Sequence, residues 1–401
     1  SFDRKNYFYP DLPKGYQITQ MTKPIVEKGS IKIYLDGSEK VINITRAHLE
    51  EDAGKSIHDL FDGETGVDLN RAGTPLLEIV SEPEISNAKE AVAYFKAIRQ
   101  LVTFLDICDG NMAEGSMRCD VNVSIKKNDS SELGTRAELK NINSFKFIEK
   151  AINFEIDRQT KLLENGESVV QETRLYDSEK NETRSMRSKE EANDYRYFPC
   201  PDLLPVVISD KELIEIKENL PELPEEKEKR YVEDIGLDKS EAVIISSSKA
   251  MANMFEEASA KTNDAKLVAK WLVGDVSALL NKDNIEIDES KLSAENFGKL
   301  IERITDNTIS GKIAKSVLED IWENGSDVDK VIETKGLVQI QDESILEDIA
   351  QKVIQSNPDQ VSAYLNGKDK LFGFFVGQIM KETQGKANPK SVNDILRRLL
   401  K

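Results

Sequence analysis

The stretch Glu114-Gly115-Ser116-Met117-Arg118-Cys119-Asp120-Val121-Asn122-Val123-Ser124-Ile125 alternates polar and apolar residues with a period of two. Such a period predicts a β-strand with one polar face, formed by Arg118, Asp120, Asn122 and Ser124. The opposite face would belong to the core and carries Cys119, Val121, Val123 and Ile125. A rigid strand that presents a row of mixed charge positions charged groups well. A solvated sheet face is the alternative.

Three further segments repeat this pattern. Residues 135–141 alternate so that Arg136, Glu138 and Lys140 share one face of a predicted strand. Residues 76–80, which follow the turn signal Gly73-Thr74-Pro75, place Glu78 inside an apolar strand. A carboxylate there is costly unless it is paired or bound to a metal. Residues 44–52 add further acidic groups beside a histidine.

The acidic groups are not accompanied by Cys/His pairs, so the ligands on offer are mostly hard oxygen atoms. Such ligands suit Mg²⁺, and lysine and arginine nearby suit phosphate. The residues alone therefore favour a site that binds Mg²⁺ and phosphate.

The whole chain has 401 residues and a formal net charge of −18. This length allows two or three domains, and this charge argues against a simple nucleic-acid coat protein. Residues 366–401 differ, since they hold eight Lys/Arg against three Asp/Glu. The local excess of positive charge hints at an anionic partner, and a solvated helix face explains it equally well.

The three cysteines, Cys108, Cys119 and Cys200, form no CxxC motif, so neither a disulfide framework nor a zinc site is indicated. A reducing compartment, the cytoplasm, is therefore expected. The sequence contains no apolar run of membrane-spanning length and no signal peptide, which predicts no membrane association. Because the chain opens at Ser1 inside a motif and without Met, we expect it to be an N-terminally incomplete part of a longer protein.

Short alternating segments dominate as far as Ser209, with helical patterns at 88–105 and 145–165 and a last predicted strand at 206–208. This organisation predicts an α+β fold, with a mainly antiparallel sheet and inserted helices. The stretch 219–227 is rich in proline and charge and indicates a domain boundary.

Beyond this boundary the pattern is helical, at 266–280, 294–304 and 313–322, with a short hinge at 336–340 and a terminal bundle at 343–401. We therefore expect three domains. These are a sheet domain at 1–219, a helical linker at 220–332 and a small helical tail at 333–401.

Several common catalytic motifs are absent. Gly54-Lys55-Ser56 resembles the end of a P-loop, but position 49 is Leu where that motif needs glycine. The sequence has no GxGxxG, HExxH or GxSxG motif, and its only histidines are His48 and His58. A Ser–His hydrolase and a site with several histidine ligands are therefore disfavoured.

Ordered blocks along the whole chain resemble the B subunits of the glutamine-dependent aspartyl/glutamyl-tRNA amidotransferases. The blocks lie at 3–18, 45–55, 67–83, 114–122, 137–143, 171–174, 194–199, 311–315 and 377–381. Each block alone is a weak signal, but chance does not readily produce all of them in this order.

The resemblance implies a cradle domain, a helical linker and a helical tail that holds the outer corner of a tRNA. It implies that the cradle uses ATP and Mg²⁺ to phosphorylate the side-chain carboxylate of Glu or Asp on a misacylated tRNA. Ammonia then displaces the phosphate and gives Gln-tRNA(Gln) or Asn-tRNA(Asn). The implied partners are an amidase-type glutaminase (the A subunit), which makes the ammonia, a small third protein (the C subunit), and the misacylated tRNA.

The resemblance also implies roles for residues at matching positions. The expected Mg²⁺ ligands are Glu51, Glu78 and Glu114, with Glu50 and Asp120 as second choices. The expected contacts of phosphate or of the substrate carboxylate are Lys5, Arg118 and Lys140. His48 and Glu138 are expected to orient other groups or to exchange protons. For each of these residues the alternative to a functional role is an ordinary ion pair at the surface or in the core.

The chain departs from the family at its start, because family members carry roughly seventy further residues with a Gly-Leu-Glu-Val-His segment. We expect that segment to supply cradle strands and metal ligands. Two other functions stay open. One is a metal-dependent phosphoesterase or nuclease, which would need no ATP, and the other is a tRNA-binding scaffold whose acidic rows are structural.

Overall fold

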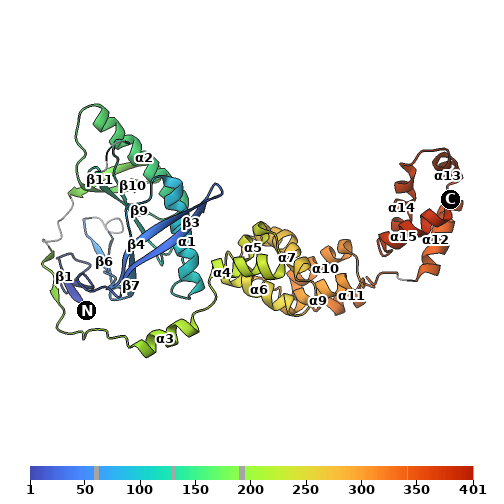
Figure 1. The fold of residues 1–401 in the computed structure, drawn as a ribbon, viewed down its shortest axis with the longest axis horizontal. Coiled ribbons are helices and arrows are strands. Elements are labelled where there is room, and N and C mark those ends of the chain that lie inside the picture. The colour runs from blue at the N-terminus through green and yellow to red at the C-terminus, as the bar shows by residue number, and fades with distance from the viewer. Residues whose placement is uncertain (58–62, 129, 131, 189–194, 341, 401) are drawn as a thin grey trace. The chain divides into compact units, whose positions relative to one another are not determined.

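The computed structural model describes residues 1–57, 63–128, 130, 132–188, 195–340 and 342–400 (Figure 1). His58, named above, and Asp194, the first residue of the matching block 194–199, lie outside these ranges. The chain divides into two compact units, Ser1–Pro221 and Glu222–Lys401. We call them the strand-rich unit and the helical unit, because the named strands of the described chain all lie in the first. The expected α+β class is confirmed.

The strand-rich unit contains four small sheets. Three are antiparallel, with the orders β12-β1-β2, β3-β4-β7 and β5-β6, and the fourth has the order β11-β10-β9-β8. The strands of the first three sheets are β1 (Asp3–Asn6), β2 (Tyr16–Thr19), β12 (Phe198–Pro199), β3 (Val26–Leu35), β4 (Ser38–Glu51), β7 (Pro75–Ser81), β5 (Lys55–Ile57) and β6 (Gly66–Asp68).

The four-stranded sheet contains the two alternating segments that the sequence singled out. Its strands are β8 (Cys119–Val123), β9 (Ala137–Ile142), β10 (Glu172–Asp177) and β11 (Glu182–Ser188). Cys119, Val121 and Val123 face the core while Asp120 and Asn122 are exposed, so the predicted faces of β8 are confirmed. The strand ends at Val123, before Ser124 and Ile125. One pair, β9 with β10, is parallel, because the connecting helix α2 crosses over the sheet.

Helices α1 (Ala88–Phe104) and α2 (Phe145–Glu164) match the two predicted helical segments to within one residue at each end. Each begins at a residue whose side chain caps a free backbone N–H, Asn87 for α1 and Ser144 for α2. The two helices pack on one another and bury apolar residues against the four-stranded sheet (Figure 1).

A long hairpin of β3 and β4 positions the candidate site. Asp36 and Gly37 form its two-residue turn with φ values of 51° and 79°, the left-handed conformation that such a turn requires. The second half of β4 also pairs with β7, and this register sets His48 directly opposite Glu78.

The strand predicted at 206–208 does not form. These residues are exposed and pair with no strand of the described chain, and helix α3 (Asp210–Asn219) follows them. A run of three apolar residues has strand propensity, but a strand also needs a sheet edge that accepts its hydrogen bonds.

The helical unit contains two separate hydrophobic cores. The first draws on residues between Tyr231 and Ile332 and the second on residues between Leu346 and Leu400. Elements of the first part are α4 (Pro224–Arg230), α5 (Lys239–Ile245), α6 (Lys249–Ser259), α7 (Ala265–Trp271), α8 (Ser277–Asp283), α9 (Ala294–Thr305), α10 (Gly311–Asn324) and α11 (Val328–Thr334). The second part holds α12 (Glu343–Gln355), α13 (Pro358–Leu365), α14 (Leu371–Glu382) and α15 (Pro389–Leu399).

The predicted helix at 266–280 is present as α7 and α8, joined by a π-helical turn at Leu272–Val276. Between the two cores, residues 336–340 form no helix. Whether the cores act as separate domains stays a prediction. Among the described helices, none combines the length and the apolar character that a membrane span needs.

A buried charge network ties α2 to the four-stranded sheet. Glu155 on α2 is fully buried and accepts two hydrogen bonds from Arg158, at 2.9 Å from Nε and 2.6 Å from Nη2. Thr183 Oγ1 on β11 and Gln159 Nε2 donate to it at 3.1 and 2.9 Å, and Arg174 Nε on β10 lies 3.5 Å away. Because the carboxylate is paired on every side, its burial is tolerated.

Replacing Glu155 by Ala should lower the free energy of unfolding of the strand-rich unit by about 3–5 kcal/mol, because it leaves buried arginine charge uncompensated. Urea denaturation followed by circular dichroism measures this loss. The fluorescence transition of Trp271 and Trp322, which lie in the helical unit, should not move. Glu215→Ala, which breaks only the exposed pair with Lys211, is the matched control and should change stability by less than about 0.5 kcal/mol. Equal losses in the two variants would contradict the assignment.

Candidate functional site

His48, Glu50 and Glu78 form the one group of three or more potential metal ligands found in the described part of the chain. One ligand atom from each residue lies within 4.8 Å of the others. His48 and Glu50 share a face of β4 because they are two residues apart, and Glu78 reaches the group from β7 through the strand register. His48 Nε2 lies 3.9 Å from Glu50 Oε2 and 3.7 Å from Glu78 Oε2.

The surroundings of this group disfavour its charged forms. The imidazole of His48 is buried, and this burial lowers the pKa of His48 although Glu78 opposes the shift. His48 Nδ1 is also buried and has no hydrogen-bond partner. Burial, and then the charge of Glu78, raises the pKa of Glu50 to about 7. A bound cation would favour both the neutral imidazole and the ionised carboxylate.

Lys5 on β1 lies beside this group. Its positive charge acts on the groups on β4, where it lowers the pKa of His48 and opposes the rise of the Glu50 pKa. The ammonium lies over the ring of Tyr195, 4.6 Å from its centroid, and 5.7 Å from that of Tyr7. The aromatic faces hold the cation in place without neutralising it.

The three glutamates expected as metal ligands do not gather. Glu51 points away from the Glu50 face of β4, where its carboxylate pairs with Lys14 and accepts the Ile18 N–H at 2.7 Å. Glu114 is exposed in the loop before β8, and its backbone oxygen accepts a hydrogen bond from Arg71 Nη1 at 3.2 Å. Of the expected three, the described group contains only Glu78.

Arg118 lies just before β8, and its guanidinium binds Asp52 through both Nη atoms, at 3.1 and 2.5 Å. Arg71 Nε donates to the same carboxylate at 3.1 Å. Sequence reasoning missed Asp52 and Arg71 as site residues. A signal for Asp52 was present, because His48, Glu50 and Asp52 continue one period-two row.

Asp120, Glu138 and Lys140 form a second charged group on the four-stranded sheet. Lys140 Nζ lies 2.5 Å from Asp120 and 3.8 Å from Glu138. Thr173 Oγ1 donates to Glu138 at 3.0 Å. Alternation predicted that Glu138 and Lys140 share a face, and the pairing of β8 with β9 brings Asp120 to them, outside the group of His48, Glu50 and Glu78.

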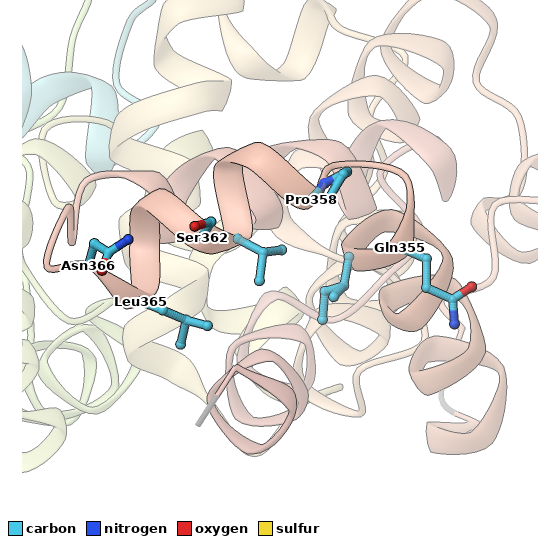
Figure 2. A pocket seen from close by; sticks show the side chains of 7 residues that line it. Gln355, Pro358, Ser362, Leu365 and Asn366 are labelled. Carbon is cyan, nitrogen blue, oxygen red and sulfur yellow. The ribbon is translucent and has the colours of Figure 1, made fainter.

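A groove of about 510 Å³ lies elsewhere, in the tail between α12 and α13 (Figure 2). It is lined by Ile354, Gln355, Pro358, Val361, Ser362, Leu365 and Asn366. Because these residues offer no charge and no nucleophile suited to phosphate chemistry, we place the chemistry at the His48 group.

The raised pKa of Glu50 predicts a specific pH dependence of stability in the absence of metal. A carboxyl with a higher pKa in the folded protein holds an extra proton there, so stability falls as pH rises from about 4.5 to about 7. Glu50→Gln should remove this loss. The free energy of unfolding of the variant should gain on the order of 3 kcal/mol relative to wild type between about pH 5 and about pH 8.

Urea denaturation in EDTA at several pH values measures this difference. Glu39→Gln, at the exposed start of the same strand, is the matched control and should give a constant difference from wild type. Parallel pH curves for Glu50→Gln and wild type would contradict the prediction.

Two protein-family models match the chain. One, described as the GatB/GatE catalytic domain, matches residues 1–215 and therefore covers every site residue discussed above. The other, described as a GatB domain, matches residues 253–400.

Known proteins match over the full length of the chain. The B subunit of the aspartyl/glutamyl-tRNA(Asn/Gln) amidotransferase of Hydrogenovibrio crunogenus is 60% identical over 401 residues, which are 100% of this chain and 84% of the relative. Proteins of the same name from Thioalkalivibrio sulfidiphilus and Pseudomonas aeruginosa are 59% and 58% identical, with the same coverage. The chain therefore belongs to the family of B subunits of the aspartyl/glutamyl-tRNA(Asn/Gln) amidotransferases.

Proposed function

We propose that this chain performs the ATP-dependent transamidation of misacylated Glu-tRNA(Gln), Asp-tRNA(Asn) or both. The observation that carries the proposal is the group of His48, Glu50 and Glu78, with cations beside it, inside the segment that matches the family's catalytic domain. A carboxylate reacts poorly with ammonia, so it must first gain a leaving group. The γ-phosphoryl group of ATP moves to the substrate carboxylate, ADP leaves, and ammonia then attacks the acyl carbon, releasing phosphate and a proton.

The residues present fit Mg²⁺, because the carboxylates of Glu50 and Glu78 supply hard oxygen atoms within 4.8 Å of one another. Glu50 and Glu78 would hold the ion, which when bound neutralises charge on the phosphates. His48 would orient these carboxylates or exchange a proton. Because Glu51 is occupied by Lys14 and the Ile18 N–H, we assign it to structure and not to the metal.

The cations of the site suit phosphoryl transfer, which depends on positioning and on charge neutralisation. Lys5 and Arg118 lie close enough to Glu50 to act on its pKa, and we propose that they contact phosphate. Lys140 would contact the substrate carboxylate from the four-stranded sheet, and Glu138 would orient other groups or exchange a proton. Lys140 pairs with both Asp120 and Glu138, so this second group contains one positive and two negative side chains.

We further propose that the chain works in the cytoplasm as part of a heterotrimer. An amidase-type glutaminase, the A subunit, would supply ammonia, and the small C subunit would join the two larger proteins. Ammonia must arrive unprotonated, so delivery from a partner suits the reaction better than uptake from solvent. The misacylated tRNA would be held partly by the tail.

Alanine at Glu50 or Glu78 should lower glutamine-dependent transamidation by the assembled enzyme at least roughly 100-fold, because each removes a proposed ligand. Glutamine hydrolysis by the partner should persist. Glu51→Ala tests the ligand that was expected from the sequence. Because Glu51 is not assigned to the metal here, the folded variant should keep its Mg²⁺-dependent activity. Glu39→Gln controls for loss of an exposed carboxylate on the same strand. Wild-type transamidation by Glu50→Ala and Glu78→Ala would refute the metal assignment, and transamidation without ATP would refute the proposed function.

Truncation after Ile340 tests the tail. The cut removes the second hydrophobic core and spares the first, to which Ile332 and Leu337 belong. The Kd for tRNA should rise and its salt dependence should flatten, because residues 366–401 carry excess positive charge and phosphate contacts release counterions. Binding at several salt concentrations measures both, and the melting of the strand-rich unit should stay unchanged. An unaltered Kd and salt slope would show that the charge is only a solvated helix face.

A further inference from the structure

We infer that Arg71 and Arg118 form a binding site for the phosphate groups of ATP, and that the buried Asp52 is the positioning residue that holds them. This inference rests on the proposed function, because it assigns a second part of the same site. It is drawn from the contacts of Asp52, which join three segments that are distant in sequence.

Asp52 is only 7% exposed, and its own backbone is fixed first. Its N–H donates to Thr74 O at 2.8 Å, and its carbonyl oxygen accepts the Gly73 N–H at 2.9 Å. Its carboxylate then accepts hydrogen bonds from both Nη atoms of Arg118 and from Nε of Arg71. Two guanidinium groups that would repel each other are thereby held side by side by one carboxylate.

The two arginines keep unused binding capacity. Their side chains are 53% exposed for Arg118 and 41% exposed for Arg71, although their shared partner is buried. Each guanidinium has five N–H donors. In the described part of the chain Arg118 uses two of them on Asp52, and Arg71 uses one on Asp52 and one on Glu114 O. Six of the ten N–H donors of the pair therefore have no partner in the described part of the chain. The two arginines and Asp52 together carry one net positive charge, which suits an anion with several oxygen atoms.

The position of Gly115 shows that the guanidinium groups of Arg71 and Arg118 lie close together. A Cβ atom on this residue would lie 3.4 Å from Arg71 Nη1 and 3.8 Å from Arg118 Nε. Its φ of 76° lies in the left-handed region that glycine favours, so the loop can approach both guanidinium groups closely. The absence of a side chain here leaves the space beside the arginine pair open.

The position of the pair favours ATP over the tRNA backbone as the source of the phosphate. Asp52 comes two residues after Glu50, directly after the end of β4, and its carboxylate holds both arginines, so the pair lies next to the proposed metal ligands. A polyphosphate bound to a metal there would have oxygen atoms left for arginine, as phosphoryl transfer requires. An ion-pair network that served only to join three segments of the chain would not need exposed guanidinium groups.

Steady-state kinetics of the assembled amidotransferase test the inference. Arg71→Lys and Arg118→Lys keep the charge but lose the paired donors, and each should raise the KM for ATP roughly tenfold with little change in the KM for misacylated tRNA. Asp52→Asn should raise the KM for ATP as well. In the double variant Arg71→Ala/Arg118→Ala, the further change Asp52→Asn should raise the KM for ATP little more, because Asp52 would act only through these arginines.

The matched control is Asp329→Asn, which removes the carboxylate from another arginine, Arg303, in the helical unit and should leave both KM values unchanged. If Asp52→Asn fails to fold, the two lysine variants decide alone. An unchanged KM for ATP in both, or a rise in the KM for tRNA instead, would overturn the inference. Failure of the proposed function would be distinct, since wild type itself would then need no ATP.

Discussion

The register between β4 and β7 places the central groups of the candidate site. Antiparallel pairing sets His48 opposite Glu78, and the period of two carries Glu50 to the same face. If the pairing of β4 with β7 shifted by one residue, this face would turn to the other side of the sheet. The site residues of the two strands would then no longer lie together. The two-residue turn at Asp36 and Gly37 sets where β4 begins. It thereby affects the position of site residues that lie more than ten residues further along the strand.

The same register imposes a cost on the fold. The partly buried carboxylate of Glu50 lies next to that of Glu78, and this proximity opposes folding when no cation compensates the two charges. A site that stores unfavourable electrostatics in this way is better suited to bind a cation than a site whose charges are already paired. Glu51 shows the contrast, since its carboxylate on the neighbouring position is fully engaged by Lys14 and the Ile18 N–H.

The sequence predicted local features well and non-local ones poorly. Alternation identified β8 and β9 with their faces, and the helical patterns located α1 and α2. Alternation also implies that the adjacent Glu50 and Glu51 point to opposite faces, but only the pairing with β7 decides which face holds the site. Glu114 was expected from the family resemblance, and it lies in the loop before β8, outside the group of His48, Glu50 and Glu78. The contact between Arg118 and Asp52 joins residues 66 positions apart, and no local pattern predicts it.

Two buried carboxylates in the strand-rich unit, Glu155 and Asp52, each hold two arginines, and the difference between them separates structure from function. The arginines of Glu155 are 20% and 11% exposed in their side chains, and Arg174 spends further donors on Glu172 and Thr183. That network is closed and offers nothing to a ligand. The arginines of Asp52 are several-fold more exposed and retain most of their donors. The same ion-pair chemistry thus supports a sheet in one place and presents a preorganised cationic surface beside the proposed metal ligands in the other.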